Sequence, residues 1–420
     1  QRAFRTWANA GFWLSLATGM TACLLTIAAA PWVARFYRLE EPTQLSSLIG
    51  IMSLIFPIGA IGGVFRAKLQ IDMRFREFAF AGFFQIVLDA VLKIVLALLG
   101  YGAFSFAYAS LFSSVAYLIL CWGLAPVPIR LQPQFRRWKY LIGDGSLVVS
   151  AALLYWLIDE GDYLVLGRFE DVGVVGLYFF AFKLSRHTMT LLTLQFSRVL
   201  FPALSSMPQD TDKQVRAFVR AARMVATVSM PCCFMLAAIA EPLVHLLFQE
   251  RWYAAIELVQ IMCLGMALRT ISWPAASLLQ AQGRFRTRML LGIISVLVFF
   301  PVAILGTSLG SVRGLAIAVA AFYSVVALVD VATAVWPAGQ VARPLRPIFG
   351  VSLLSSGLAT LPALAVAYVL LPILGLPAVA LEILQIVVIG LVAGSLYCAL
   401  IRWLSPDVWR ESRDRLASVL

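Results

Sequence analysis

The stretch YWLIDEGDYLVLGRFEDVGVVGLYFFAFKLSRH, residues 155–187, combines two kinds of sequence. Its apolar flanks have the length and character of membrane helices, yet acidic residues interrupt the first flank and basic residues interrupt the second. A charge at the centre of a spanning helix costs about 3 kcal/mol on insertion scales. The stretch therefore predicts two adjacent membrane helices whose charges either pair with each other or serve a function.

The composition of the whole chain is that of a membrane protein. Of its 420 residues, 61% are hydrophobic and 13% are charged, and the mean hydropathy is +0.90. A soluble domain has about 25% charged residues. Apolar runs of about 20 residues recur along the chain, and each is long enough to cross a bilayer. We therefore expect an all-α polytopic membrane protein. Its net charge of +12 is explained by basic connections on one side of the membrane, so no nucleic-acid partner is expected.

The hydropathy pattern predicts twelve membrane helices in this chain. They are expected at 11–34, 43–65, 78–99, 102–124, 146–166, 172–194, 224–247, 254–280, 289–309, 313–336, 348–372 and 378–401. Lys and Arg are distributed unevenly between the two sides: 24 lie in one alternate set of connections and termini, and five lie in the other. Both termini are therefore expected in the cytoplasm. The longest connection, residues 195–223, is then cytoplasmic, and much of it is suited to an amphipathic helix at the interface.

The chain contains an internal repeat at an offset of 210 residues. IMSL at 51–54 matches IMCL at 261–264, and RFR at 74–76 matches RFR at 284–286. Over residues 51–100, 13 of 50 positions are identical, against roughly 10% expected for unrelated apolar stretches. Both copies place the RFR connection in the cytoplasm, so the repeat is parallel. This predicts two helical lobes around a central cleft, as in transporters.

The repeat also predicts the domain organisation. The second copy has two helices before the segment that matches the start of the first, so two further helices are expected before residue 1, giving about 14 in the full protein. Residues 1–124 are then a first lobe without its first two helices. Residues 125–336 are a second lobe of six helices, and 337–420 are a final helix pair with a cytoplasmic tail.

Two segments resemble a known family. The span that contains DYLVLGRF, followed by VGLYFFAFKLS, is similar to the middle of the polysaccharide-transporter family, and VFRAKLQIDMRFREFAF is similar to its connection between the fourth and fifth spans. These are the Wzx-type flippases for lipid-linked O-antigen and exopolysaccharide units, within the multidrug/oligosaccharidyl-lipid/polysaccharide superfamily. The resemblance covers essentially the whole chain.

The resemblance implies a function and a location. The expected substrate is an undecaprenyl-pyrophosphate-linked oligosaccharide, moved from the cytoplasmic to the periplasmic leaflet of the bacterial inner membrane by alternating access. Such transport serves O-antigen, capsule or exopolysaccharide biosynthesis. Membrane lipids are expected partners, together with a polysaccharide polymerase and its chain-length machinery. No cofactor and no metal are expected, and a proton or sodium gradient would drive the cycle.

Four basic residues lie within spans and are the candidate substrate-binding residues: Lys93, Lys183, Arg186 and Arg269. Lys183 and Arg186 are three residues apart, on one helical face. They can form a cationic wall for a pyrophosphate, or pair with acids of the preceding helix to hold the lobe together. The two interpretations are compatible if the pair opens during transport. Arg269 either faces the cleft and binds phosphate or bonds carbonyls freed near Pro274.

Four residues are candidates for ion coupling: Asp89, Asp159, Asp162 and His187. Asp159 and Asp162 are three residues apart and suited to share a proton or a sodium ion, although structural pairing is the alternative. Asp89 and Lys93 have the spacing of an intrahelical ion pair, and a role in the cleft is the alternative. His187 is suited to relay protons or to be a buried hydrogen-bonding residue. Glu160 is expected to be solvated.

Two other classes of function remain open. A lipid II flippase or a multidrug/cation antiporter of the same superfamily has the same helical pattern, but an antiporter for cations should carry acids in its cleft. A polymerase or ligase for lipid-linked glycans is an enzyme with similar hydropathy. It needs a large outward loop with catalytic residues, whereas the expected outward connections are all short, so we expect no enzyme.

Overall fold

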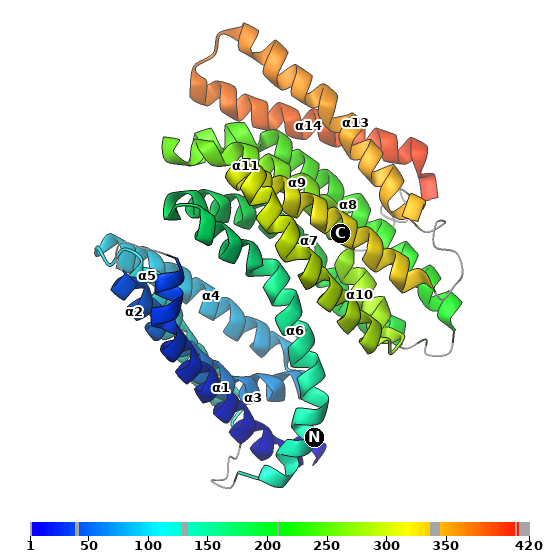
Figure 1. Cartoon of the computed structure of the whole chain (residues 1–420). Helices are drawn as coiled ribbons and strands as arrows, with labels where there is room; N and C mark the ends of the chain where they lie inside the picture. Colours follow the sequence, from blue (N-terminus) through cyan, green and yellow to red (C-terminus); the bar gives the residue numbers. More distant parts are fainter. Residues whose placement is uncertain are drawn as a thin grey trace. The chain divides into compact units, whose positions relative to one another are not determined.

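The computed structural model describes residues 2–37, 42–127, 133–205, 207, 210–336, 345–407 and 410, and these ranges are helices joined by short turns, with no strand among them (Figure 1). Each of the twelve expected spans falls on helical residues, so the all-α polytopic fold is confirmed. Within the described ranges, nine helical stretches are long and apolar enough to cross a membrane. Two helices that carry the intramembrane charges, α6 (Phe135–Phe169) and α7 (Val172–Ser205), are not among those nine.

The first of two compact units comprises residues 1–150. Its helices are α1 (Arg2–Phe36), α2 (Pro42–Ser53), α3 (Ile55–Ile71), α4 (Phe75–Leu98), α5 (Phe104–Leu124) and the N-terminal part of α6. Helix α1 packs against α2 and α3, and α5 packs against α3 and α4. At Gly19 on α1, an added Cβ would lie 2.8 Å from the Cβ of Ala60. Small residues allow this close approach of helices, which is how membrane helices commonly associate.

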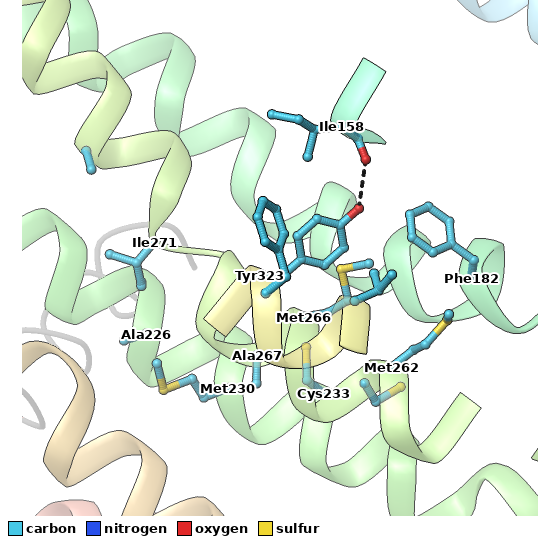
Figure 2. Packing of buried hydrophobic residues seen from close by; sticks show 14 of the residues in the cluster. Ile158, Phe182, Ala226, Met230, Cys233, Met262, Met266, Ala267, Ile271 and Tyr323 are labelled. Atoms are coloured by element: carbon cyan, nitrogen blue, oxygen red, sulfur yellow. Dashed lines mark hydrogen bonds between the residues drawn. The ribbon is translucent and has the colours of Figure 1, made fainter. Parts of the chain in front are cut away.

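The second unit comprises residues 151–420. Its described helices are the C-terminal part of α6, α7, α8 (Thr211–Leu247), η1 (Glu250–Ala255), α9 (Ile256–Arg269), α10 (Ser272–Ala281), α11 (Phe285–Val335), η3 (Arg346–Gly350), α13 (Val351–Ala365), η4 (Val366–Leu370), η5 (Leu371–Leu374) and α14 (Ala378–Leu404). Buried side chains of α6 to α11 form one continuous core, part of which Figure 2 shows. The final pair, α13 and α14, pack on each other and on α8 (Figure 1).

The boundary between the compact units lies at residues 150 and 151, inside α6, rather than between 124 and 125. The expected lobe boundaries and the cleft between the lobes therefore stay predictions.

The turn before each RFR segment has the same backbone hydrogen bonds in both copies. In the first copy, the amides of Asp72, Met73 and Arg74 donate to the carbonyls of Lys68, Gln70 and Leu69. In the second, the amides of Gln282, Gly283 and Arg284 donate to those of Leu278, Gln280 and Leu279, each 210 residues further on. The middle residue has a positive φ in both copies, 56° at Met73 and 69° at Gly283. The repeat seen in the sequence is therefore a repeat of backbone structure.

The arginine of each turn fastens the turn to a later helix in its own unit. Arg74 Nη1 donates to the carbonyl oxygen of Leu124 at 2.7 Å, and Arg284 Nη1 donates to that of Thr333 at 2.8 Å. Charge-assisted hydrogen bonds of this kind are stronger than neutral ones. The first arginine of each RFR segment therefore has a structural role in its own copy.

The connection expected at 195–223 is mostly two helix ends. Helix α7 continues to Ser205, and α8 begins at Thr211. Asp210 caps α8, because its Oδ1 accepts the backbone N–H of Lys213 at 2.8 Å. An acidic N-cap also favours the positive end of the helix dipole. Residues 211–223 are therefore the first turns of a spanning helix rather than a separate interfacial helix.

Helix α11 consists of two helices joined by a tight turn. Gly310 and Ser311 have non-helical dihedral angles there, which agrees with the turn expected between 309 and 313. The two arms approach closely beside the turn, because a Cβ added to Gly306 would lie 2.8 Å from the carbonyl oxygen of Gly314. Glycine at both positions allows the arms to meet backbone to backbone.

Candidate functional site

Five charged residues of the second unit gather where α6, α7 and α9 meet. Asp159 and Glu160 come from α6, Lys183 and Arg186 come from α7, and Arg269 is the last residue of α9. We call these five side chains the charged cluster. Lys183 and Arg186 are three residues apart and share one face of α7, from which both reach Glu160 of α6.

Asp159 links two helices through its two carboxylate oxygens. Oδ1 pairs with Arg269 Nη2, and Oδ2 pairs with Arg186 Nη2 at 3.1 Å. The side chains of Asp159 and Arg269 are only 16% and 12% exposed. Breaking a buried pair by removing one partner leaves an uncompensated charge and is strongly destabilising. Asp159 therefore joins Arg186 of α7 to Arg269 of α9.

Glu160 belongs to the same cluster, so the expectation that it is solvated was wrong. Its Oε1 accepts Arg186 Nη1 at 3.0 Å and lies 3.9 Å from Lys183 Nζ. Its side chain is only 25% exposed. Glu160 follows Asp159 on α6, and both carboxylates reach the cations of α7. The charge of Glu160 is therefore compensated by Arg186 and Lys183 rather than by water.

Arg269 is held by an aromatic face as well as by a carboxylate. Its guanidinium carbon lies 3.6 Å from the centre of the Tyr323 ring on α11. The Tyr323 hydroxyl donates to the carbonyl oxygen of Ile158 at 3.3 Å, which fixes the ring (Figure 2). A desolvated cation over an aromatic ring is stabilised by about 2 kcal/mol. Arg269 Nη1 is buried and has no hydrogen-bond partner among the described residues.

Cations outnumber carboxylates among the five side chains of the charged cluster. Three cations, Lys183, Arg186 and Arg269, contact two carboxylates, Asp159 and Glu160. Two further carboxylates, Asp162 and Asp330, are buried and act electrostatically on Arg269. Lys183 is the most exposed of the three cations and is therefore the one most available to an anion.

Asp162 lies apart from the cluster's contacts. It is fully buried, its Oδ2 accepts the Tyr178 hydroxyl at 2.7 Å, and its Oδ1 accepts the backbone N–H of Tyr163 at 2.9 Å. Asp159 and Asp162 thus bind different partners. Both residues are therefore structurally paired, Asp159 with two arginines and Asp162 with a tyrosine. Their role in ion coupling stays a prediction.

Asp89 and Lys93 form the expected intrahelical ion pair in the first unit. The second oxygen of Asp89, Oδ1, lies 3.2 Å from Ser110 Oγ and 3.3 Å from Ser113 Oγ on α5. Lys93 Nζ lies 5.6 Å from the centre of the Phe106 ring. The pair therefore also ties α4 to α5, and its role in substrate binding or coupling stays a prediction.

His187 is exposed, so the expectation of a buried hydrogen-bonding histidine was wrong. It follows Arg186 on α7 but points away from the buried side. A role as a proton relay stays a prediction. Within the described part of the chain, no three His, Cys, Asp or Glu side chains converge as they would around a metal ion.

Sequence reasoning missed the residues that complete the site on α11. Tyr323 lies in an apolar run and was given no role, and the buried Asp330 was left unassigned. Their spacing of seven residues places them on one helical face and was the available indication. Tyr178 was missed for the same reason, because a tyrosine within LYFFAFK reads as a core aromatic residue.

A family model described as "Polysaccharide biosynthesis protein" matches residues 5–257. The "Lipopolysaccharide biosynthesis protein WzxC" of Escherichia coli (strain K12) is 26% identical over 312 residues, which are 72% of this chain and 61% of WzxC. The "Succinoglycan biosynthesis transport protein ExoT" of Rhizobium meliloti (strain 1021) is 26% identical over 271 residues, which are 63% of this chain and 52% of ExoT. The chain thus spans about 52–61% of the length of these two relatives.

Solved structures share the fold. The lipid II flippase MurJ, in its inward closed conformation, superimposes with a TM-score of 0.73 at 13% identity, over 96% of this chain and 85% of MurJ. An inward-facing multidrug resistance MATE transporter of the MOP superfamily gives a TM-score of 0.63 at 16% identity, over 82% of this chain and 83% of the transporter. At these identities the likeness concerns the arrangement of the helices.

Proposed function

Because the chain belongs to the family of polysaccharide biosynthesis proteins, we propose that it transports a lipid-linked oligosaccharide across the bacterial inner membrane. The cargo is an undecaprenyl-pyrophosphate-linked repeat unit, and it moves from the cytoplasmic to the periplasmic leaflet by alternating access. The relatives WzxC and ExoT, named for lipopolysaccharide biosynthesis and succinoglycan transport, support this class of cargo. The product would serve O-antigen, capsule or exopolysaccharide assembly.

The observation that carries the proposal is the gathering of three cations, Lys183, Arg186 and Arg269, in the charged cluster. Arg186 and Arg269 present guanidinium groups, whose planar fork suits phosphate oxygens, and Lys183 adds a mobile cation. An intramembrane ionisable residue is by default a candidate for a transport pathway. The pyrophosphate of the cargo is the anionic group that these cations would bind.

Two alternatives from the same superfamily compete with this proposal. MurJ, whose fold the chain shares, is a lipid II flippase, and lipid II would also present an anionic head group to the cluster. The MATE transporter shares the fold as well, but a cation as cargo would be repelled by the net positive charge of Lys183, Arg186 and Arg269. We therefore favour an anionic, lipid-borne cargo.

An enzyme that polymerises or ligates such glycans is the remaining alternative. Where the structure describes the chain, connections on the expected outward side are short, such as residues 99–103 between α4 and α5 and residues 170–171 between α6 and α7. A catalytic loop on the outward side would need more residues than these turns contain. We propose transport without a catalytic step, with both termini in the cytoplasm and with a polymerase and chain-length machinery as downstream partners.

The test replaces a cation of the cluster and measures surface polysaccharide. Lys183→Gln and Arg269→Gln should each reduce surface polysaccharide at least about tenfold in a strain that depends on this protein, while membrane levels remain normal. Arg313→Gln is the matched control, because Arg313 belongs to an exposed ion pair. It contacts Glu257 at 2.7 Å, and the two side chains are 66% and 50% exposed, respectively. Normal polysaccharide with both cluster variants would contradict the proposal.

A further inference from the structure

The three cations of the charged cluster are held with unequal firmness. Lys183 is 47% exposed, and its Nζ lies 3.9 Å from Glu160. Arg186 is 26% exposed and bonds both carboxylates at 3.0 and 3.1 Å. Arg269 is 12% exposed and lies between Asp159 and the Tyr323 ring. A ligand that arrives from the exposed side therefore meets the loosest contact first and the tightest last.

The two carboxylates occupy the donors that a phosphate would use. Arg186 splits its fork, with Nη1 on Glu160 and Nη2 on Asp159. Carboxylate and phosphate oxygens accept from the same donors with the same planar geometry. The cluster thus already contains two anionic acceptors on neighbouring residues, each bonded to one terminal nitrogen of Arg186.

We infer that Asp159 and Glu160 are internal competitors of the cargo, which hold the cations until a lipid diphosphate displaces them. This inference rests on the proposed function and adds the step by which cargo is recognised. Glu160 is displaced first, because it is 25% exposed and its contact with Lys183 is long. Asp159 is displaced second, because it is 16% exposed and also holds the buried Arg269. The competing carboxylates lower the affinity of the cluster for every anion. A diphosphate can replace both carboxylates, whereas a single phosphate group can replace only one, so the diphosphate is favoured.

The displacement has a consequence for the helices. Both competing acids lie on α6, whereas the cations lie on α7 and α9. When the cargo takes over the cations, α6 loses its ionic attachment to both neighbours at this level. Helix α6 is also the helix in which the boundary between the compact units falls along the chain. Release of α6 is therefore a route by which binding of cargo is converted into conformational change.

The test measures binding of undecaprenyl pyrophosphate to the purified protein in nanodiscs. Glu160→Gln should bind this lipid about fivefold more tightly than wild type, since one competing charge that is partly exposed is removed. Glu160→Asp keeps the charge and should stay near wild type. Glu257→Gln is the matched control, because it makes the same change at an exposed pair of the same unit, Glu257 with Arg313, and should leave affinity unchanged.

Two further arms separate the inference from the proposed function. Undecaprenyl phosphate should bind wild type at least about tenfold more weakly than the diphosphate, and Lys183→Gln should weaken binding of the diphosphate. If Lys183→Gln weakens binding while Glu160→Gln binds no more tightly than wild type, the competition is refuted and the proposed function stands. If wild type fails to bind undecaprenyl pyrophosphate, the proposed function itself is refuted.

Discussion

Removal of one partner of the ion pair between Asp159 and Arg269 should strongly destabilise the folded protein. Both side chains are less than one-fifth exposed, so loss of one partner leaves a buried charge without compensation. Removal of one member of a buried pair costs about 3–5 kcal/mol. For Asp159→Asn we expect a value near 3 kcal/mol, because the Tyr323 ring still covers Arg269 and a neutral amide oxygen still accepts a hydrogen bond.

The opposite change is expected to cost less. Arg269→Gln removes the buried cation, while Asp159 keeps its bond to Arg186 at 3.1 Å. We expect about 1–2 kcal/mol for this variant. The double variant should cost about 1–2 kcal/mol less than the sum of the two single changes, because neither charge is then left unpaired.

The assay is unfolding of the purified protein in mixed detergent micelles, followed by circular dichroism. The matched control is a second cycle at Glu257→Gln and Arg313→Gln, whose side chains are 50% and 66% exposed and whose coupling should be below about 0.5 kcal/mol. Equal coupling in the two cycles, or additive effects at Asp159 and Arg269, would refute the view that the charged cluster is a buried and mutually dependent unit.

Three further predictions concern the scaffold and its pH dependence. Gly306→Leu should prevent the arms of α11 from meeting, because the new side chain collides with the Gly314 carbonyl. The midpoint of thermal unfolding should then fall by several degrees, and an unchanged midpoint would contradict the close approach. Met73→Gly should raise stability by about 0.5–1 kcal/mol in denaturant titrations, since the positive φ is strained for methionine; a loss of stability would contradict this. The pKa of Asp210 is lowered, chiefly because its carboxylate accepts the Lys213 backbone N–H. The ionised Asp210 therefore stabilises α8 fully at a pH above the ordinary aspartate pKa, and this stabilisation is lost as pH falls through the lowered pKa. Asp210→Asn keeps the cap and should abolish this acid-side dependence of unfolding, and an unchanged dependence would contradict the assignment.

The fold was predictable from the sequence because hydropathy and basic residues carry most of the information in a membrane protein. Apolar length determines where a helix can span, and the repeat RFR fixed the relation between the copies at 74–76 and 284–286. The bond-for-bond match of the two turns shows that this repeat was real. The long connection expected at 195–223 was harder, because residues 211–223 are polar but continue without a break into the apolar part of α8.

The candidate site was predictable only in part. Lys183, Arg186 and Arg269 were conspicuous because charges are rare within spans. Their partners depended on which faces of α6, α7 and α9 meet, and that is decided by tertiary packing. Glu160 therefore seemed solvated although it pairs with Arg186, and Tyr323 seemed a core residue although it covers Arg269.

The most direct test of the account is translocation of an undecaprenyl-pyrophosphate-linked oligosaccharide by the purified protein in liposomes. A glycan-cleaving enzyme added outside reports how much of the labelled lipid has crossed to the outer leaflet. Wild type and Arg313→Gln should move the lipid at equal rates, and Lys183→Gln should move it at least about tenfold more slowly. Equal rates in empty liposomes and in liposomes with wild-type protein, or undiminished transport by Lys183→Gln, would contradict the claim that an intramembrane cation cluster receives an anionic lipid-linked glycan.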